Sequence, residues 1–337
     1  MTKNTLLEVR NVKKYFPIKD KNIFSSKKQY VQAVNGVSFT VNEGETFGLV
    51  GESGCGKSTL ARLIMGLIKA DSGEIHFEGR NFLQLSGKEL RKNRKSMQMV
   101  FQKPYESLNP KMTVEQIIRA PFDIHGVYSK QERVQKVKEL LEMVGLSQQY
   151  LDRYPHEFSG GQRQRIGIAR AIALHPKLVI CDEAVSALDV SIQSQILNLL
   201  NDLQKDFNLT YLFISHDLSV VKHVSDKIGV MYLGEMVEVG DAETVYNNPK
   251  HPYTQALLSA IPVPDPSFKK ERIVLEGDLP SPVNPPNGCR LSTRCPYVMP
   301  ICKEKKPELF NISTHQSVAC HLFSDTTNDE MDQIASS

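Results

Sequence analysis

No apolar stretch in the 337-residue chain reaches the length of about 20 residues that a membrane-spanning helix needs. The first residues, MTKNTLLEVR, also lack the apolar core of a signal peptide. We therefore expect an intracellular protein. If it serves a membrane process, we expect it to act as a peripheral subunit on the cytoplasmic face of the cell membrane.

The chain also lacks a large net charge, because its formal value is only +3 at pH 7. A balance this close to neutrality provides no strong field for attracting nucleic acid, so we expect no nucleic-acid partner. The densest positive run is KELRKNRK, residues 88–95. This run fits either a solvated helix face or a surface that approaches anionic lipid headgroups.

Three segments alternate apolar and polar residues, namely 7–10, 37–41 and 75–78. This period of two predicts half-buried strands of an antiparallel sheet. The polar, lysine-rich residues 17–30 lie between the first two segments and predict a surface loop.

Three later runs are short and continuously apolar, namely 46–50, 178–181 and 211–214. Such runs are typical of strands that are buried on both faces, as in a parallel sheet covered by helices. Each run ends in a polar residue, which we expect at the carboxyl edge of the sheet, where chemistry is placed in such folds.

Changes in residue composition and spacing divide the rest of the chain into regions. Residues from about 103 to 157 contain helical spacing, with Gly145 as an expected helix stop, and predict a helical insertion on the α/β core. We expect one domain over residues 1–250. A proline-rich segment with several cysteines follows over 251–323, and the acidic tail 324–337 is expected to be disordered.

The segment GESGCGKST follows one of the predicted buried strands and matches the phosphate-binding P-loop pattern. Its glycines let backbone N–H groups converge on phosphate oxygens, and the following helix directs its N-terminus there. Lys57 would neutralise the β- and γ-phosphates, and Ser58 would ligate Mg²⁺. We expect the helix N-terminus to lower the pKa of the Cys55 thiol. The motif comprises Gly51, Glu52, Ser53, Gly54, Cys55, Gly56, Lys57, Ser58 and Thr59.

A pair of carboxylates ends the apolar run at 178–181. Asp182 would hold Mg²⁺, and Glu183 would point elsewhere because strand side chains alternate. Glu183 is then free to polarise the attacking water as a general base.

A second anion-binding element is predicted at FSGGQ, before the helical run QRQRIGIARAIAL. Ser159 and Gln162 have the spacing of a capping box, so the segment is a helix N-terminus, and such ends attract anions. A chain that already has its own phosphate cradle would use this element for the nucleotide of a neighbour. The element comprises Ser159, Gly160, Gly161 and Gln162.

These motifs resemble those of the ATP-binding-cassette ATPases, over about residues 6–250. Gln102 in MVFQ matches the family's Q-loop, residues 186–189 match its D-loop, which ends at Asp189, and His216 in FISHD matches its switch histidine. The resemblance implies a parallel-sheet core with an antiparallel β subdomain and a helical subdomain. It also implies that two such chains pair head to tail, each signature closing over the partner's ATP.

The resemblance also implies roles for individual residues. Gln102 would contact Mg²⁺, and His216 would contact the γ-phosphate. Phe16 is the expected aromatic that stacks on adenine, with Tyr15 as the alternative. The sequence departs from the family at Ala184, where a proline commonly follows the catalytic glutamate.

The chain has no fused transmembrane domain, second cassette, inserted coiled coil or guanine-reading N-K-x-D element. Its segment HPYTQALLSAIPVPDP and the cysteines beyond it resemble the oligopeptide/dipeptide importer ATPases, specifically the second of their two non-identical ATPase subunits. This implies ATP-driven oligopeptide import with a second cassette subunit and two permease subunits, which would contact residues 102–157. An extracellular peptide-binding protein would be an indirect partner. Import of another cargo, such as dipeptides, nickel or a metal chelate, is the alternative, and a soluble cassette ATPase outside transport is a further one.

Four cysteines gather near the end of the chain, and in a reducing cytosol such a group suggests metal binding. Zinc sites usually show paired cysteine knuckles, which are absent, whereas a [4Fe–4S] cluster accepts looser spacing. The resemblance to the importer subunits also implies a [4Fe–4S] cluster. Zinc, with His321 as a spare ligand, and free buried thiols are the alternatives. The four are Cys289, Cys295, Cys302 and Cys320.

Overall fold

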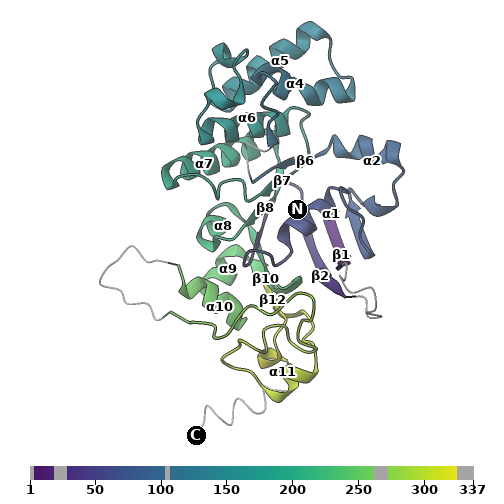
Figure 1. Ribbon diagram of the computed structural model, residues 1–337, viewed down its shortest axis with the longest axis vertical. Coiled ribbons are helices and arrows are strands. Elements are labelled where there is room, and N and C mark those ends of the chain that lie inside the picture. Colours follow the sequence, from purple (N-terminus) through teal and green to yellow (C-terminus); the bar gives the residue numbers. More distant parts are fainter. Residues whose placement is uncertain (1–3, 19–28, 103–106, 262–271, 325–337) are drawn as a thin grey trace.

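The structure is a computed structural model that describes residues 4–18, 29–102, 107–261 and 272–324. Two β-sheets form its middle, helices gather at one end, and the C-terminal segment lies at the other (Figure 1). Most of residues 17–30, expected as a loop, and of the expected tail 324–337 lie outside the described ranges.

The smaller sheet is antiparallel and has four strands, in the order β2-β1-β4-β5. It confirms the strands that alternation predicted, because buried and exposed positions follow each other along β1. Its strands are β1 (Thr5–Pro17), β2 (Tyr30–Asn42), β4 (Ser72–Phe77) and β5 (Arg80–Asn81).

The larger sheet has eight strands, in the order β11-β12-β10-β9-β3-β8-β7-β6. The three apolar runs form β3, β7 and β8, which are buried along their whole length and pair in parallel, as predicted. The strands are β3 (Thr46–Val50), β6 (Met97–Val100), β7 (Leu178–Asp182), β8 (Thr210–Ser215), β9 (Lys227–Tyr232), β10 (Glu235–Asp241), β11 (Phe310–Ser313) and β12 (Gln316–Val318).

The expected helical insertion contains α4 and α5, each of which begins with a complete capping box, at Thr113 and Ser129. Gly145 has φ 70° just beyond α5, consistent with the expected helix stop. The α-helices are α1 (Lys57–Ile64), α2 (Gly87–Arg94), α4 (Val114–His125), α5 (Lys130–Met143), α6 (Gly160–Ile172), α7 (Val190–Phe207), α8 (Leu218–Val224), α9 (Ala242–Asn247), α10 (Pro252–Ser259) and α11 (Pro300–Glu304). Short 3-10 helices lie at Phe82–Gln84, Gln148–Tyr150, Pro155–Glu157 and His321–Phe323.

Among the helices of the described ranges, none is both long and apolar enough to cross a bilayer. Helix α2, which carries most of the basic run 88–95, has no buried residue.

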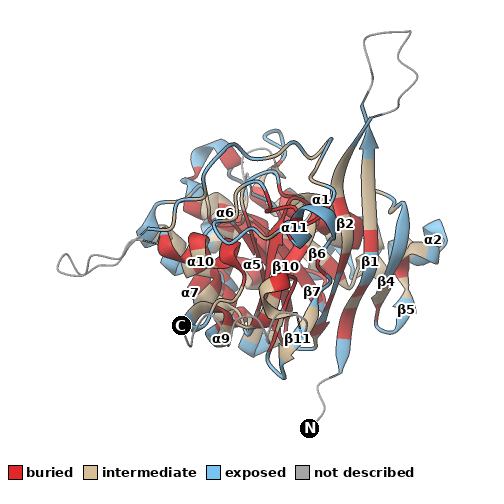
Figure 2. Cartoon of the chain, turned by 90° about the horizontal axis from the view of Figure 1, so that it is seen from below, coloured by how far each residue is buried: buried red, intermediate tan, exposed pale blue. Residues whose placement is uncertain are grey.

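The buried residues gather in the strands of the two sheets and in the helix segments beside them (Figure 2). Phe39 of β2 stacks on Phe47 of β3 with ring centroids 4.6 Å apart, which joins one sheet to the other. Complete burial of one such side chain contributes roughly 1.5–3 kcal/mol. This packing holds the antiparallel sheet against the strand that leads into the P-loop.

The C-terminal segment adds strands to the same sheet as the cassette, because β12 pairs with β10. Glu238 of β10 is 0% exposed, and its carboxylate accepts hydrogen bonds from the backbone N–H groups of Lys250 (2.8 Å) and His251 (2.9 Å) and from the side chain of Gln316 (2.6 Å). One buried carboxylate therefore ties α10 and β12 to β10. The proposed division near residue 250 separates regions that share a sheet.

His251 makes the stability of this joint depend on pH. Its Nδ1 caps α10 by accepting from the N–H of Tyr253 (3.1 Å), and burial lowers the pKa of His251 to about 3. An unfolded histidine has a pKa near 6.5, so only the unfolded state takes up this proton between the two values. The stability that neutral, buried His251 contributes to the folded state is therefore fully present above about pH 6.5 and is lost as the pH falls toward 3.

Replacing His251 with Asn keeps a capping acceptor but removes the titration. Between about pH 7 and pH 5, we expect the free energy of unfolding of the wild-type chain to fall more steeply than that of His251→Asn, by up to about 1.4 kcal/mol per pH unit. The melting temperature of the wild-type chain should therefore also fall more steeply. Thermal unfolding followed by circular dichroism at several pH values measures this difference. Parallel curves for the two proteins would contradict it.

Candidate active site

The parallel pairing of β3, β8 and β7 brings the predicted motifs to one edge of the sheet. Val50, the last residue of β3, is opposite Ser215 of β8, and Asp182 of β7 is opposite Ile214. The P-loop, the carboxylate pair and the switch histidine therefore all begin where these strands end.

The P-loop conformation requires glycine at two tight positions. Gly51 has φ 154°, and a Cβ there would lie 2.1 Å from the carbonyl oxygen of Met231. Gly56 has φ 108° and precedes α1, and a Cβ there would lie 2.0 Å from the carbonyl oxygen of Ala33. Larger residues cannot occupy either place without moving the backbone.

Lys57 points back into the loop, where it is only 4% exposed. Its Nζ donates to the carbonyl oxygens of Gly51 (2.7 Å) and Glu52 (3.0 Å). Carbonyl oxygens satisfy the donors without neutralising the positive charge, so Lys57 remains available to an anion such as phosphate.

Ser58 and Asp182 are brought into direct contact. The Ser58 Oγ donates to Asp182 Oδ1 at 2.9 Å. Burial raises the pKa of Asp182, and the neighbouring Glu183 charge adds to the effect. A hydroxyl and a carboxylate at the end of a phosphate cradle are oxygen ligands of the kind that Mg²⁺ prefers, so this pair fits the ion.

Glu183 adopts a left-handed backbone, with φ 49°, at the turn after β7. Such a conformation is uncommon outside glycine and is found at functional sites. The Glu183 Oε2 accepts a hydrogen bond from Gln102 Nε2 at 2.6 Å and lies 3.5 Å from His216 Nδ1. The structure thus brings together all the side chains that were expected to act in hydrolysis.

A pocket of about 340 Å³ opens between these groups and the antiparallel sheet. Phe16 lines it, whereas the Tyr15 hydroxyl donates to Asn35 Oδ1 at 2.5 Å. The wall also contains residues that sequence reasoning missed, because they belong to no recognised motif. These are Val31, Gln32, Ala33, Leu233, Gly234 and Pro282.

The signature lies away from this pocket, at the start of α6. Its capping box is present as predicted, with Ser159 Oγ accepting from the Gln162 N–H (3.3 Å) and Gln162 Oε1 accepting from the Ser159 N–H (3.0 Å). Asp189 is exposed ahead of α7. Neither the signature residues nor Asp189 are among the described residues that line the pocket.

Comparisons with known proteins show the family to which the chain belongs. A family model described as ABC transporter matches residues 34–186, and one described as oligopeptide/dipeptide transporter, C-terminal region, matches residues 237–302. The oligopeptide transport ATP-binding protein AppF of Bacillus subtilis is 58% identical, over 95% of this chain and 98% of the relative. The chain belongs to the oligopeptide and dipeptide transport ATP-binding proteins of the ABC family.

Other relatives and solved structures support this membership. OppF of Escherichia coli is 52% identical over 94% of this chain and 96% of the relative. DppF of Haemophilus influenzae, a dipeptide transport protein, is 49% identical over 94% and 96%. A dimeric ATP-binding cassette solved in a post-hydrolysis state with ADP and Pi is 29% identical, with a TM-score of 0.62 over 70% of this chain and 99% of its own.

The four cysteines expected to bind metal lie close enough together to influence one another. Burial raises the pKa of Cys320, and the charges of Cys289, Cys295 and Cys302 raise it further, to about 12. None of the six cysteines of the chain is paired in a disulfide. Within the described ranges, no three His, Cys, Asp or Glu side chains are arranged to hold a metal ion, so the structure does not show the expected site. His321 Nε2 contacts the carbonyl oxygen of Lys305 at 2.9 Å.

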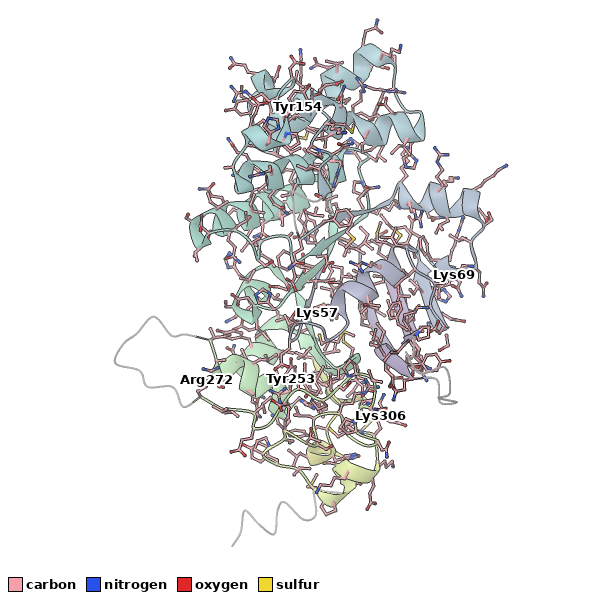
Figure 3. All side chains as sticks on the ribbon, in the orientation of Figure 1. Lys57, Lys69, Tyr154, Tyr253, Arg272 and Lys306 are labelled. Carbon is pink, nitrogen blue, oxygen red and sulfur yellow. The ribbon has the colours of Figure 1, made fainter. Side chains whose placement is uncertain are left out.

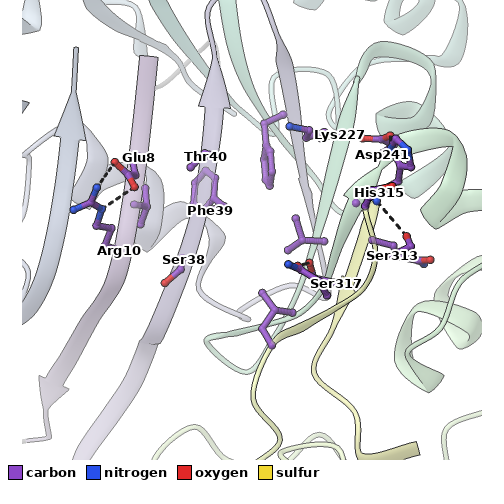
Figure 4. Close-up of a pocket in the computed structure, with 18 residues that line it drawn as sticks. Glu8, Arg10, Ser38, Phe39, Thr40, Lys227, Asp241, Ser313, His315 and Ser317 are labelled. Carbon is purple, nitrogen blue, oxygen red and sulfur yellow. Dashed lines mark hydrogen bonds and ion pairs between the residues drawn. The ribbon is translucent and has the colours of Figure 1, made fainter. Parts of the chain in front are cut away.

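A larger pocket of about 420 Å³ lies between the two sheets, away from every predicted site residue (Figure 4). Its ionisable groups already have partners, because Arg10 bonds to Glu8 (2.7 Å), His315 Nδ1 lies 2.7 Å from Asp241 Oδ2, and Lys227 pairs with Glu45 (3.3 Å). Little unpaired charge therefore remains there for a ligand.

The expectation for Cys55 was wrong in direction. The side chain is 4% exposed, and burial raises the pKa of its thiol even though the nearby Lys57 opposes the shift. The effect of the helix N-terminus is smaller than the cost of placing a thiolate away from water.

We expect Cys55 to resist alkylation in the native chain near pH 7.5, with or without ATP, because the reactive thiolate is rare and covered. Cys181, whose pKa burial raises to about 12, serves as the internal control. Iodoacetamide labelling followed by peptide mass spectrometry measures both residues before and after unfolding. Rapid labelling of Cys55 in the native, nucleotide-free chain would refute the expectation.

Proposed function

We propose that this chain hydrolyses ATP on the cytoplasmic face of the membrane and thereby powers the import of oligopeptides through a permease. The observation that carries the proposal is that Lys57, Ser58 and Glu183 line one pocket, in a chain 58% identical to an oligopeptide transport ATP-binding protein. Asp182 bonds to Ser58 and His216 lies beside Glu183, just behind the pocket wall. The dipeptide transport relative is less similar, at 49%, so oligopeptide is the favoured cargo.

The P-loop would bind the ATP phosphates. Its backbone N–H groups and the start of α1 face the anion, and Lys57 would exchange the carbonyl oxygens of Gly51 and Glu52 for phosphate oxygens. Ser58, Asp182 and Gln102 would hold Mg²⁺. When bound, this ion would supply positive charge that stabilises the negative charge developing during phosphoryl transfer. Phe16 would stack on the adenine from its place on the pocket wall.

Hydrolysis would depend on the carboxylate of Glu183. It would accept a proton from the attacking water, while Gln102 and His216, which already approach its Oε2, orient the water and the γ-phosphate. The departure at Ala184 removes no reacting group, and Ala184 is buried in the core at 2% exposure.

A second cassette would complete the site. The signature presents a helix N-terminus that attracts anions but lies outside this chain's own pocket, which is what head-to-tail pairing requires. The matched cassette bound to ADP and Pi is itself described as dimeric. Asp189, exposed before α7, would lie in the same interface.

Two permease subunits would contact residues 102–157. Several large apolar side chains are exposed on and beside this region, as expected for a surface that docks on other helices. They are Phe101, Ile124, Tyr128, Met143 and Tyr154. An extracellular peptide-binding protein would supply most of the specificity, and nucleic acid has no part in the proposal.

A [4Fe–4S] cluster on the four cysteines remains part of the proposal. Three sulfurs each accept a backbone N–H from the residue two positions later, from Leu291, Tyr297 and Leu322. Such hydrogen bonds stabilise thiolate ligands and tune cluster potentials. These three donors would favour the thiolate form of Cys289, Cys295 and Cys320, which is the form that would bind the cluster. Structural support of the C-terminal segment is its favoured role.

Replacing Glu183 with Gln removes the general base while keeping the side chain's size. We expect the ATPase rate to fall by about a hundredfold or more, with ATP still bound. In cells whose native gene is replaced, uptake of labelled oligopeptides should be lost at equal protein level. The control is Glu243→Gln, which alters an exposed carboxylate on α9. Oligopeptide uptake that continues with Glu183→Gln would contradict the proposed cargo, and unchanged ATPase activity would contradict the role of Glu183.

Anaerobically purified protein should be brown and contain about four irons per chain if the cysteines bind a cluster. Cys302→Ser should lose the colour and the iron, whereas Cys181→Ala, which alters a buried cysteine outside the group, should keep both. Absorption spectra and elemental analysis measure the difference. A colourless wild-type protein with stoichiometric zinc would overturn the cluster.

A further inference from the structure

Glu52 of the P-loop joins the nucleotide pocket to the C-terminal region. Its carbonyl oxygen accepts from Lys57 Nζ, its backbone N–H donates to the hydroxyl of Tyr253 at 2.8 Å, and its carboxylate accepts from Arg294 at 3.3 Å. One residue thus links the phosphate-binding lysine to two side chains more than 200 positions away.

Tyr253 is built to hold this contact. The side chain is 0% exposed on α10 and packs on Tyr232 with ring centroids 4.6 Å apart, so its hydroxyl has a fixed position. Figure 3 shows Tyr253 below Lys57, toward the C-terminal segment. Because the N–H of Glu52 points at Tyr253, it is used to fix the loop and is not offered to phosphate.

Arg294 supports the same residue from the cysteine-containing segment. Its side chain is 13% exposed and contacts both Glu52 and the hydroxyl of Tyr232 (3.4 Å). The Glu52 side chain is 32% exposed, so the pair is partly shielded from solvent and has a somewhat stronger effect than a pair at an open surface.

The wall of the pocket is held by the same region. Arg290 donates to Gln32 Oε1 (2.5 Å) and to the carbonyl oxygen of Leu233, and the N–H of Gln32 donates to the carbonyl oxygen of Pro282 (2.9 Å). Gln32, Leu233 and Pro282 all line the pocket. The C-terminal segment therefore contacts the pocket at its loop and at its wall.

We propose that Tyr253 and Arg294 are positioning residues that hold the P-loop in its nucleotide-binding conformation, so that the C-terminal region sets the affinity of the cassette for ATP. This inference rests on the proposed ATP-binding function. A loop that loses these anchors samples other conformations when empty, and ATP then binds only the competent fraction.

The test compares two buried tyrosine hydroxyls in the full-length chain. Tyr253→Phe removes the acceptor for Glu52 but keeps the ring. Tyr211→Phe, the matched control, removes a buried hydroxyl that donates to the carbonyl oxygen of Leu200 at 3.0 Å, away from the P-loop. Titration with a fluorescent ATP analogue and Mg²⁺ gives the affinity, and thermal unfolding without nucleotide gives the stability.

We expect both variants to melt at lower temperature, but only Tyr253→Phe to bind the analogue more weakly, by about threefold to tenfold. Equal affinity for wild type and Tyr253→Phe, or equal weakening in Tyr211→Phe, would overturn the inference. A wild-type chain that binds no ATP analogue would instead contradict the proposed function.

Substitutions of the charged pair test the second anchor. Arg294→Gln should weaken binding, and Arg294→Lys, which keeps the charge, should restore part of the loss. Glu52→Gln combined with Arg294→Gln should bind little more weakly than either single variant, because both remove the same contact. Fully additive losses in the double variant would show that Arg294 does not act through Glu52.

Discussion

The parallel register of β3, β8 and β7 is the constraint on which the rest of the site depends. Residues Thr46–Val50 pair with 211–215 on one side, and β8 in turn pairs with β7. Because parallel strands end at the same edge of the sheet, the functional residues that follow three strands far apart in sequence lie close together. A shift of one residue in either pairing would turn every side chain of a strand to its other face and separate Ser58 from Asp182.

The local parts of this arrangement could be predicted from the sequence, because each is specified by its own residues. The P-loop, the carboxylate pair and the capping box at Ser159 follow from short spacings, and the structure contains all three. The expected reason for the direction of Glu183 was wrong, because it lies beyond β7 with φ 49°, so a left-handed turn and not strand alternation sets its direction. The fully buried strands could also be predicted, because a strand covered on both faces is a continuous apolar run in the sequence.

The parts that sequence reasoning missed depend on long-range contacts. Leu233, Gly234 and Pro282 reach the pocket wall only through the pairing of β9 with β10 and the return of the C-terminal segment. The prediction that the pKa of Cys55 is lowered was wrong for a related reason. The helix N-terminus can be recognised in the sequence, whereas the burial that raises this pKa cannot. Tyr253 carries no chemical motif, and its contact with Glu52 depends on how α10 is placed.

The buried carboxylate of Glu238 explains how α10 comes to be placed so firmly. A carboxylate without solvent is unfavourable unless its oxygens are satisfied, and burial indeed raises the pKa of Glu238. Donors from Lys250, His251 and Gln316 meet this need only when α10 and β12 both pack on β10. The requirement to satisfy one buried group therefore fixes the helix from which Tyr253 reaches the P-loop.

These contacts are an addition to the cassette rather than a condition of its fold. The matched dimeric cassette aligns over 99% of its own length but only 70% of this chain, so a cassette forms without an equivalent of the remainder. In this chain, the residue after Cys289 is Arg290, which reaches the pocket wall, and the residue before Cys295 is Arg294, which reaches Glu52. Two of the four cysteines are thus covalent neighbours of the cations that touch the nucleotide pocket. If the positioning roles proposed above hold, any group that orders the cysteine segment also orders the P-loop, and its loss acts at the ATP site as well as locally.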